Sequence, residues 1–211
     1  LKTIYSPDLK FLSVSLMNNQ NLESLTTTNV QEANINIQGA SGLTDLNFPE
    51  AIKLGSLNVY DWDANNNLKN ISFPKVVSVN NFQIESTQVT SIDFSSLESL
   101  DNIILNNTSL INLSLPSLKT VNHSEFNSNS KLTQIYLPML EMVGTGNLNS
   151  SSEFVIRYNS VLTNVSMPNL SKIFGTLDIR SNNSLDVSTI DNCDFFVYTN
   201  NGYKCEFGSV S

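Results

Sequence analysis

Residues 76–118 read VVSVNNFQIESTQVTSIDFSSLESLDNIILNNTSLINLSLPSL, which is two copies of one 21-residue pattern followed by the start of a third. Each copy starts with an apolar residue, Val76 or Leu97, and Leu118 starts the next copy. A second apolar residue follows three positions later, and two alternating apolar pairs come after it, separated by a short polar segment. An internal repeat of this length indicates that one structural unit is used again and again along the chain.

The pattern extends over most of the sequence. Its first apolar position recurs at Leu9, Val30, Ala51, Val76, Leu97, Leu118, Leu140, Leu170 and Ile190. Five of the eight spacings are 21 or 22 residues. The two longest intervals contain extra residues at 60–67 and 144–153, which we expect to form loops on the side of a stack of repeats.

The alternating pairs predict the type of secondary structure. A period of two residues over such short segments is typical of short strands with one buried face, and no segment keeps a period of 3.6 long enough for a helix. One turn cannot bury its apolar face alone, whereas stacked turns form parallel strand ladders around a shared interior. The sequence therefore predicts an all-β, right-handed parallel β-solenoid with about 21 residues per turn.

We expect the solenoid to occupy residues 1–190 and a cap to occupy residues 191–211. Within the cap, Asn200-Asn201-Gly202 lies between apolar segments and is a hairpin signal. Cys193 and Cys205 are the only cysteines; they would form one disulfide in a secreted chain and remain thiols in a cytosolic one. A bridged pair would close the cap.

The repeat is already in phase at the start of the printed sequence. Pro7 and Leu9 match the proline and the first apolar position of later copies, so the chain enters in the middle of a turn. We expect further turns or a cap before Leu1, and any anchor to lie outside this chain.

The composition is polar without being highly charged. Only 14% of residues are charged, with a net charge of −8, while 31 Asn and 30 Ser supply most of the polarity. Asn suits tight corners and stacked amide ladders, because it tolerates a left-handed backbone and its side chain bonds nearby backbone groups. No cluster of Lys and Arg exists to bind nucleic acid, and no apolar run is long enough to span a membrane.

The sequence contains nine N-x-[ST] acceptor sites for N-glycosylation, only slightly more than its composition would produce by chance. They begin at Asn70, Asn106, Asn107, Asn112, Asn122, Asn149, Asn164, Asn169 and Asn182. Together with the low charge and the late cysteine pair, they favour an extracellular or cell-surface location. Three of them, Asn70, Asn112 and Asn164, share one phase of the repeat, so glycans there would shield one face.

Outward-facing columns show where a partner could bind. On the first strand of each turn the column is Ser15, Asn36, Asn58, Gln83, Ile104, Glu125, Val155 and Asp178. No glycosylation site lies in this column, and its apolar members, Ile104 and Val155, are candidate contacts for a partner or a second copy. Trp62, in the first insertion, is a candidate contact for a protein or a saccharide.

The sequence offers few candidate catalytic or metal-binding residues. Polysaccharide-cleaving β-solenoids need a carboxylate cluster on adjacent turns. Neither the first-strand column nor the outward column of the second strand places two acids on neighbouring turns; the latter column is Asn47, Ser72, Asp93, Ser114, Tyr136, Ser166 and Asp186. His123 is the only histidine, the cysteines lack metal-site spacing, and no glycine-rich phosphate-binding motif occurs. We therefore expect no enzyme activity, no cofactor and no metal site.

Three segments carry a resemblance to a known family: SMPNLSKIFGTLDIRSNNSLDVSTI (166–190), LSLPSLKTV (113–121) and the terminal DNC…YKC around the two cysteines. They resemble the receptor L-domain, a leucine-rich β-solenoid, and are most similar to fungal GPI-anchored cell-wall organisation proteins. The resemblance implies a closing cysteine pair, a glycosylated and lipid-anchored surface protein, and a role in wall organisation with wall proteins or polysaccharide as partners. The alternative is a ligand-binding, adhesion or self-assembling, fibre-forming module.

Overall fold

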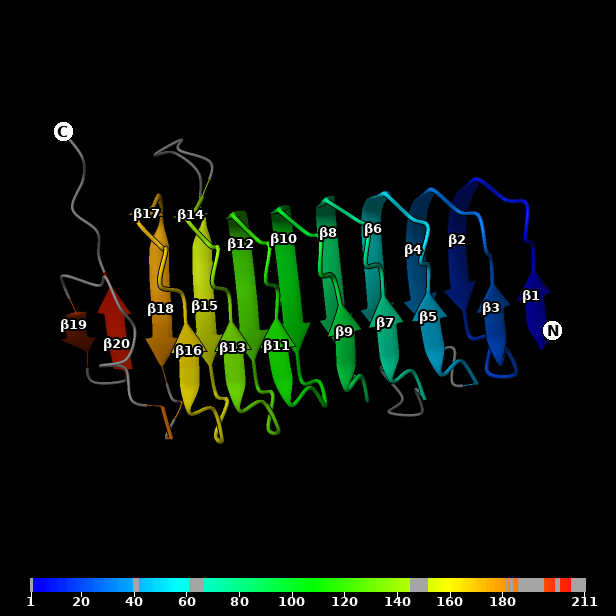
Figure 1. The fold of residues 1–211 in the computed structure, drawn as a ribbon. Helices are drawn as coiled ribbons and strands as arrows, with labels where there is room; N and C mark the ends of the chain where they lie inside the picture. The colour runs from blue at the N-terminus through cyan, green and yellow to red at the C-terminus, as the bar shows by residue number, and fades with distance from the viewer. Residues whose placement is uncertain are drawn as a thin grey trace.

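The computed structural model describes residues 2–39, 42–60, 67–144, 152–180, 182, 184 and 185, and the backbone of strands at 196–199 and 202–205. The chain is all-β, and its parallel strands stack as a β-solenoid of about 7 turns with ~22 residues per turn (Figure 1). The predicted parallel β-solenoid is therefore confirmed. The turns average slightly more than 21 residues because some of them carry insertions.

One long sheet forms the first layer of the solenoid, with one full-length strand per turn in the first six turns that it contains. These strands are β2 (Phe11–Met17), β4 (Glu32–Gln38), β6 (Lys53–Tyr60), β8 (Ser78–Glu85), β10 (Ser99–Asn106) and β12 (Thr120–Asn127). In the next two turns the strand is split in two, giving β14 (Met142–Val143) with β15 (Glu153–Arg157), and β17 (Lys172–Ile173) with β18 (Thr176–Arg180).

Short three-residue strands form the second layer, in front of the long sheet in Figure 1. They are β1 (Thr3–Tyr5), β3 (Ser24–Thr26), β5 (Asp45–Asn47), β7 (Asn70–Ser72), β9 (Ser91–Asp93), β11 (Asn112–Ser114), β13 (Gln134–Tyr136) and β16 (Asn164–Ser166). They form three separate parallel sheets, β1-β3, β5-β7-β9 and β11-β13-β16. The second layer is thus interrupted between β3 and β5 and between β9 and β11.

The strand register follows the columns of the sequence repeat. Val14 pairs with Ile35, and Phe82 with Ile103, as the repeat predicts. The first insertion separates Leu57 from its partner Phe82 without displacing either strand from the sheet.

Apolar columns point inward from both layers and form one continuous core. In the second layer, Phe48, Phe73 and Phe94 stack across three successive turns, with ring centroids 5.0 and 5.4 Å apart and interplanar angles of 11° and 16°. Phe82 of the long sheet contacts Phe94 at 4.9 Å and joins the two layers. These rings are at most 1% exposed, so the aromatic column anchors the central turns.

Each described corner after a long strand uses a left-handed residue. The non-glycine residues with positive φ are Asn18, Ser86, Asn107, Ser128 and Tyr158, and Gly39 occupies the same position. Asn and Gly adopt this conformation at the lowest cost, which accounts for part of the Asn content at the corners.

A ladder of buried asparagine side chains directly follows the corners at Ser128 and Tyr158. Asn129 and Asn159 are fully buried, and each donates its side-chain amide to a carbonyl of an earlier turn, Leu105 O and Phe126 O, at 2.8 and 2.9 Å. Their Oδ1 atoms accept backbone N–H groups of the preceding turn, from Thr108 and Asn129, both at 2.9 Å. Asn182 continues the ladder by accepting the N–H of Asn159. The ladder satisfies backbone groups that the corner leaves unpaired.

The C-terminal edge of the long sheet carries antiparallel strands. β20 (Gly202–Cys205) pairs with β18, and β19 (Phe196–Thr199) pairs with β20 across a two-residue connection. Cys193 lies outside the described residues, so its predicted disulfide with Cys205 stays a prediction.

Candidate interaction face

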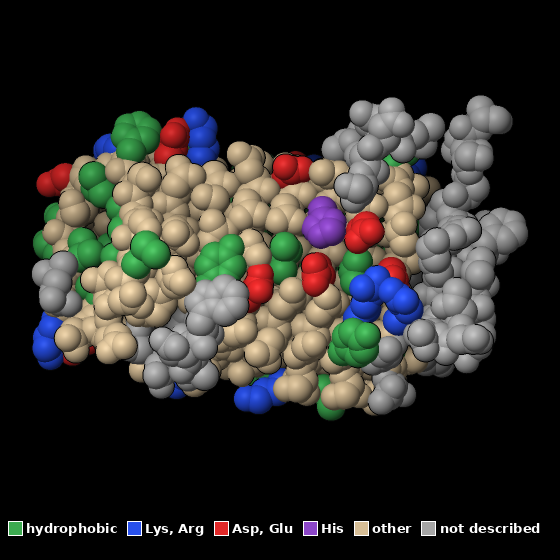
Figure 2. All heavy atoms as spheres, turned by 180° about the vertical axis from the view of Figure 1, so that it is seen from behind, with side chains coloured by type: hydrophobic (Ala, Val, Ile, Leu, Met, Phe, Trp, Pro, Cys, Tyr) green, Lys and Arg blue, Asp and Glu red, His purple; other side chains and the backbone are tan. Residues whose placement is uncertain are grey.

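The outer surface of the long sheet is the widest regular face of the molecule. The register aligns the predicted column from Ser15 through Asn36, Asn58, Gln83, Ile104, Glu125 and Val155 to Asp178. Figure 2 shows this side of the molecule, where charged and hydrophobic side chains are scattered over a surface made mostly of backbone and other side chains. We call the outer surface of β2, β4, β6, β8, β10, β12, β15 and β18 the long-sheet face.

Amide side chains on the long-sheet face hydrogen bond from turn to turn. Asn102 Nδ2 donates to Asn81 Oδ1, and Asn81 Nδ2 donates to Asn58 Oδ1, both at 2.5 Å. The Tyr60 hydroxyl donates to Gln83 Oε1 at 2.6 Å. Burial raises the pKa of Tyr60, and the Glu85 carboxylate raises it further. The Tyr60 hydroxyl therefore keeps its proton near neutral pH. The bonds hold these side chains in fixed positions, which lowers the entropy cost of binding a partner.

The two apolar candidates on this face differ in accessibility. Ile104 is half-buried and contributes to the surface. Val155 is only 3% exposed, so the expectation that it is a free contact is wrong. Its column neighbours are Glu125 and Asp178, and Arg157, two residues further along the same strand, reaches across to Asp178. The burial of Val155 leaves Ile104 as the accessible apolar side chain in the column.

Two arginines hold one carboxylate near the C-terminal end of the face. Arg180 donates from Nε and Nη2 to the two oxygens of Asp178, each at 2.6 Å, and Arg157 donates to the same side chain. The Asp178 side chain is 10% exposed. Burial alone would raise its pKa, but the hydrogen bonds and charges of both arginines outweigh burial and hold the pKa below the ordinary value. The sequence columns did not single out this cluster because the arginines lie in a neighbouring column.

The predicted glycosylation sites divide by accessibility. Asn70, Asn112 and Asn164 each start a second-layer strand and are exposed, on the layer opposite the long-sheet face. Asn107 and Asn169 are also exposed, at corners, while Asn149 lies outside the described residues.

The other three sites are half-buried and donate hydrogen bonds within the protein. Asn70 and Asn169 also donate, to Asp45 and to Pro138 O, but their side chains are exposed. Asn182 donates its side-chain amide to Ile156 O at 2.9 Å as part of the asparagine ladder, so a glycan on that nitrogen would displace the ladder. Asn106 and Asn122 are half-buried and donate to Glu125 and Asp101 respectively. The sequence motif alone could not separate these sites from the exposed ones.

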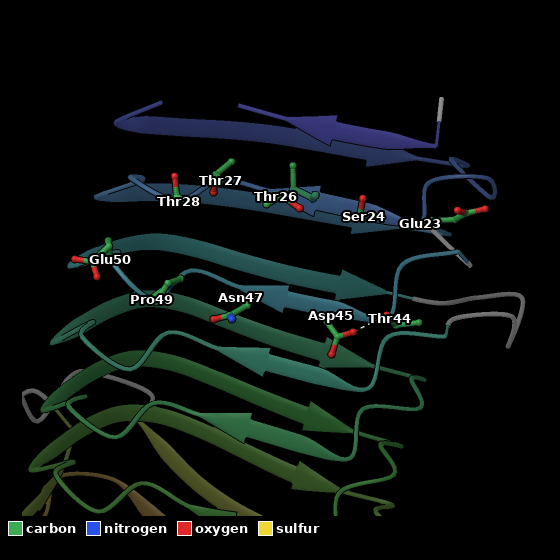
Figure 3. A pocket seen from close by; sticks show the side chains of 11 residues that line it. Glu23, Ser24, Thr26, Thr27, Thr28, Thr44, Asp45, Asn47, Pro49 and Glu50 are labelled. Carbon is green, nitrogen blue, oxygen red and sulfur yellow. Dashed lines mark hydrogen bonds between the residues drawn. The ribbon is translucent and has the colours of Figure 1, made fainter. Parts of the chain in front are cut away.

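A groove of about 400 Å³ opens where β3 and β5 are not paired (Figure 3). Threonines 26 to 28 line one side, while Asp45, Asn47 and Glu50 line the other. Asp45 accepts hydrogen bonds from Thr44 at 2.5 Å and from Asn70 at 2.6 Å, and these bonds lower its pKa. The groove therefore presents hydroxyl, amide and ionised carboxylate groups.

Thr27 accounts for the hollow. It occupies the inward position that Phe48, Phe73 and Phe94 fill in the next three turns, and the smaller side chain leaves part of that volume empty. Thr27 is 4% exposed, and its hydroxyl has no hydrogen-bond partner. The sequence repeat contained this signal, because Thr27 lies three residues before Val30 where later turns have Phe.

The structure also bears on the expected lack of a metal site and of a membrane span, for the residues that it describes. Among the described residues, no group of three or more His, Cys, Asp and Glu side chains is arranged to hold a metal ion. His123 is half-buried on the long-sheet face (Figure 2). No helix in the described part is long and apolar enough to cross a membrane. Trp62 lies outside the described residues.

Comparison of the chain with known proteins gives no match. No protein-family model, no curated protein and no solved structure matches it. The geometry of the described turns is therefore the basis for any functional assignment.

Proposed function

We propose that this chain is a non-enzymatic, N-glycosylated extracellular or cell-surface structural protein, with a role in cell-wall organisation, that contacts wall proteins or polysaccharide through the long-sheet face. The carrying observation is the separation of its two layers. The exposed acceptors Asn70, Asn112 and Asn164 lie on the second layer, while the hydrogen-bonded amide array lies on the long sheet. Glycans on one layer would leave the other free for a partner.

The resemblance to the receptor L-domain and to GPI-anchored wall proteins supports the same proposal. A leucine-rich solenoid is suited to a scaffold role, and the ionisable cluster of Asp178, Arg157 and Arg180 consists of side chains paired with one another. The disulfide between Cys193 and Cys205 and a lipid anchor outside this chain belong to this proposal.

Glycan mapping tests the extracellular assignment. In protein purified from its native source, we expect glycans at Asn70, Asn112 and Asn164, and an unmodified Asn182, as read by mass spectrometry of peptides after enzymatic deglycosylation in heavy-oxygen water. A native chain that carries no glycan and has free thiols would contradict secretion.

A binding comparison tests the long-sheet face. Ile104→Asp adds a charge to that face, whereas the matched control Ile111→Asp changes a residue that is 52% exposed immediately before β11, in the second layer. We expect Ile104→Asp to reduce co-sedimentation with insoluble β-1,3-glucan or chitin at least severalfold, and the control to bind like the unmodified chain. Equal binding by both variants would exclude the face.

The groove between β3 and β5 supports a second candidate function, saccharide binding. Its threonine hydroxyls, Asn47 amide and carboxylates match the hydrogen-bonding needs of a polyhydroxylated ligand, and Thr27 supplies a buried hydroxyl without a partner. A ligand hydroxyl that reached Thr27 would remove the cost of that unmade hydrogen bond.

Titration calorimetry with soluble β-1,3-glucan and chitin oligosaccharides tests this candidate. Thr27→Val keeps the shape and removes the hydroxyl, so we expect about tenfold weaker binding, since a hydrogen bond contributes about 1.4 kcal/mol. Thr120→Val, on the long sheet, is the control and should bind normally. Saturable binding unaffected by Thr27→Val, or no binding, would reject the groove.

A further inference from the structure

The second layer is open between two turns inside the stack, where β3 and β5 lie next to each other. β3 pairs with β1 on its other side, and β5 pairs with β7. No ladder hydrogen bond joins β3 to β5, both of which belong to the described part of the chain, although their Cα atoms approach within 8 Å. Figure 3 shows these two strands further apart than β5 and the strand below it. We call this gap, at the back of the groove, the β3–β5 slot.

One wall of the slot is the free edge of β3. The N–H of Ser24 donates to Lys2 O, and Thr26 O accepts the N–H of Ser6, so Ser24 and Thr26 face β1. Backbone groups of successive residues in a strand face alternate sides. The N–H and C=O groups of Leu25 therefore face β5.

The other wall is the free edge of β5. Thr44 O and the N–H of Phe48 both bond to β7, so Leu46, between them, also faces β7. By the same alternation, the N–H and C=O groups of Asp45 and Asn47 face β3. The slot thus has backbone donors and acceptors on both of its walls.

The width of the slot limits what it can hold. Paired strands lie about 4.8 Å apart, so a peptide strand between two others needs about 9.6 Å. An oxygen that accepts an N–H on one side and donates to a C=O on the other adds one hydrogen-bond length, about 2.8 Å, to the ordinary spacing. The resulting separation of about 7.6 Å agrees with the observed approach within 8 Å. The slot therefore fits a bridging hydroxyl, and is too narrow for a strand or for an acetamido group that spans it as a peptide unit does.

The side chains around the slot favour an uncharged ligand with hydroxyl groups. Thr27 lines the groove, is 4% exposed, and carries a hydroxyl with no hydrogen-bond partner among the described residues. Asp45 and Glu50 line the same groove, and hydrogen bonds from Thr44 and Asn70 hold the pKa of Asp45 below its ordinary value. An acidic sugar would meet these carboxylates and be repelled.

We infer that the β3–β5 slot binds a neutral saccharide whose unsubstituted hydroxyl groups bridge the facing backbone groups of Leu25, Asp45 and Asn47. This inference rests on the groove as the second candidate function, and adds which groups of the protein bind and which class of sugar fits. A hydroxyl that makes both hydrogen bonds of a bridging water can replace that water without loss. The bound sugar would then connect the two unpaired strands.

Two matched trisaccharides test the selection by width. Cellotriose and triacetylchitotriose share ring and linkage but differ at the second ring carbon, which carries a hydroxyl in one and an acetamido group in the other. We expect titration calorimetry on the full chain to give about tenfold tighter binding of cellotriose, since a bridging hydroxyl is lost in the acetylated sugar. Equal affinity, or tighter binding of triacetylchitotriose, would overturn this selection.

Hydrogen exchange resolved by residue with NMR tests the role of the backbone. We expect saturating cellotriose to slow exchange of the Leu25, Asp45 and Asn47 amides about tenfold or more, and to leave Leu46, which already faces β7, unchanged. Binding without this protection would overturn the inference and leave the groove as a saccharide site with other contacts. No binding of either sugar would reject the groove function itself.

A variant that refills the slot provides the last test. Thr27→Phe restores the ring that the next turns have at this position, so we expect it to abolish cellotriose binding. Thr163→Phe is the matched control, because Thr163 is exposed just before β16, and it should bind cellotriose normally. Circular dichroism compares the folding of both variants, and the exchange experiment needs neither. Unchanged binding by a folded Thr27→Phe chain would place the ligand outside the slot.

Discussion

Asn159 illustrates how a single polar side chain can be structural in this protein. It is fully buried, donates to Phe126 O and accepts the N–H of Asn129, so it serves two backbone groups on different turns. Asparagine carries an N–H donor and a carbonyl acceptor on one short side chain. The high Asn content of the chain thus has a structural cause in the buried ladder and at the left-handed corners.

Replacement of Asn159 by Ala is expected to lower the free energy of unfolding by about 2–6 kcal/mol, because two buried backbone groups lose their partners at roughly 1–3 kcal/mol each. Urea denaturation of the purified chain measures the change. Asn80→Ala is the matched control: Asn80 is exposed on β8, and its removal should change stability by less than about 0.5 kcal/mol. Equal effects in both variants would show that the ladder contributes nothing.

Asp178 is expected to make stability depend on acid pH. Its pKa is depressed in the folded chain, so it contributes stability that is present above the ordinary value of 3.8 and is lost as the pH falls through its folded pKa. Asp178→Asn should therefore be less stable than the unmodified chain at neutral pH and lose less stability on acidification. Thermal unfolding between about pH 7 and pH 2 tests this, with exposed Asp8→Asn as the control.

At the scale of elements, the aromatic column ties the short strands to the long sheet. Phe73 lies between Phe48 and Phe94 and is fully buried. Phe73→Ala is expected to cost about 3–5 kcal/mol, because a cavity opens in the centre of the stack. Phe73→Leu keeps most of the volume and should cost much less. If both variants unfold at the same urea concentration, ring packing is not what holds these turns together.

The elements also show which features the sequence could predict. The register of the long sheet depends on local periodicity, so Leu57 opposite Phe82 could be predicted despite the insertion between them. The burial of Val155 could not, because an outward position in a strand predicts exposure and the repeat does not show what packs over it. The groove beside Thr27 could be predicted only in part: the repeat shows the small residue in the aromatic column, but not that β3 and β5 are unpaired.

At the scale of the whole molecule, stability is expected to vary along the solenoid axis. Turns in a solenoid contact mainly their neighbours, so an uncovered end opens more easily than the middle. β2 should exchange its amide hydrogens faster than β10, because two of its three inward residues, Leu12 and Val14, are only half-buried. Hydrogen exchange with mass spectrometry measures the gradient, and uniform exchange would indicate that all turns open as one unit.

The interruption between β14 and β15 has a consequence for protein engineering. On β12, Val121 and Ser124 are three residues apart, yet their partners Val143 and Phe154 are eleven residues apart. The sheet pairing stops after Val143 and resumes at Phe154 against the same strand. The number of residues between these two positions therefore does not affect how the turns stack. Because loop closure costs only about 0.6 kcal/mol per doubling of length, foreign peptides could be grafted at this point and displayed from a rigid scaffold.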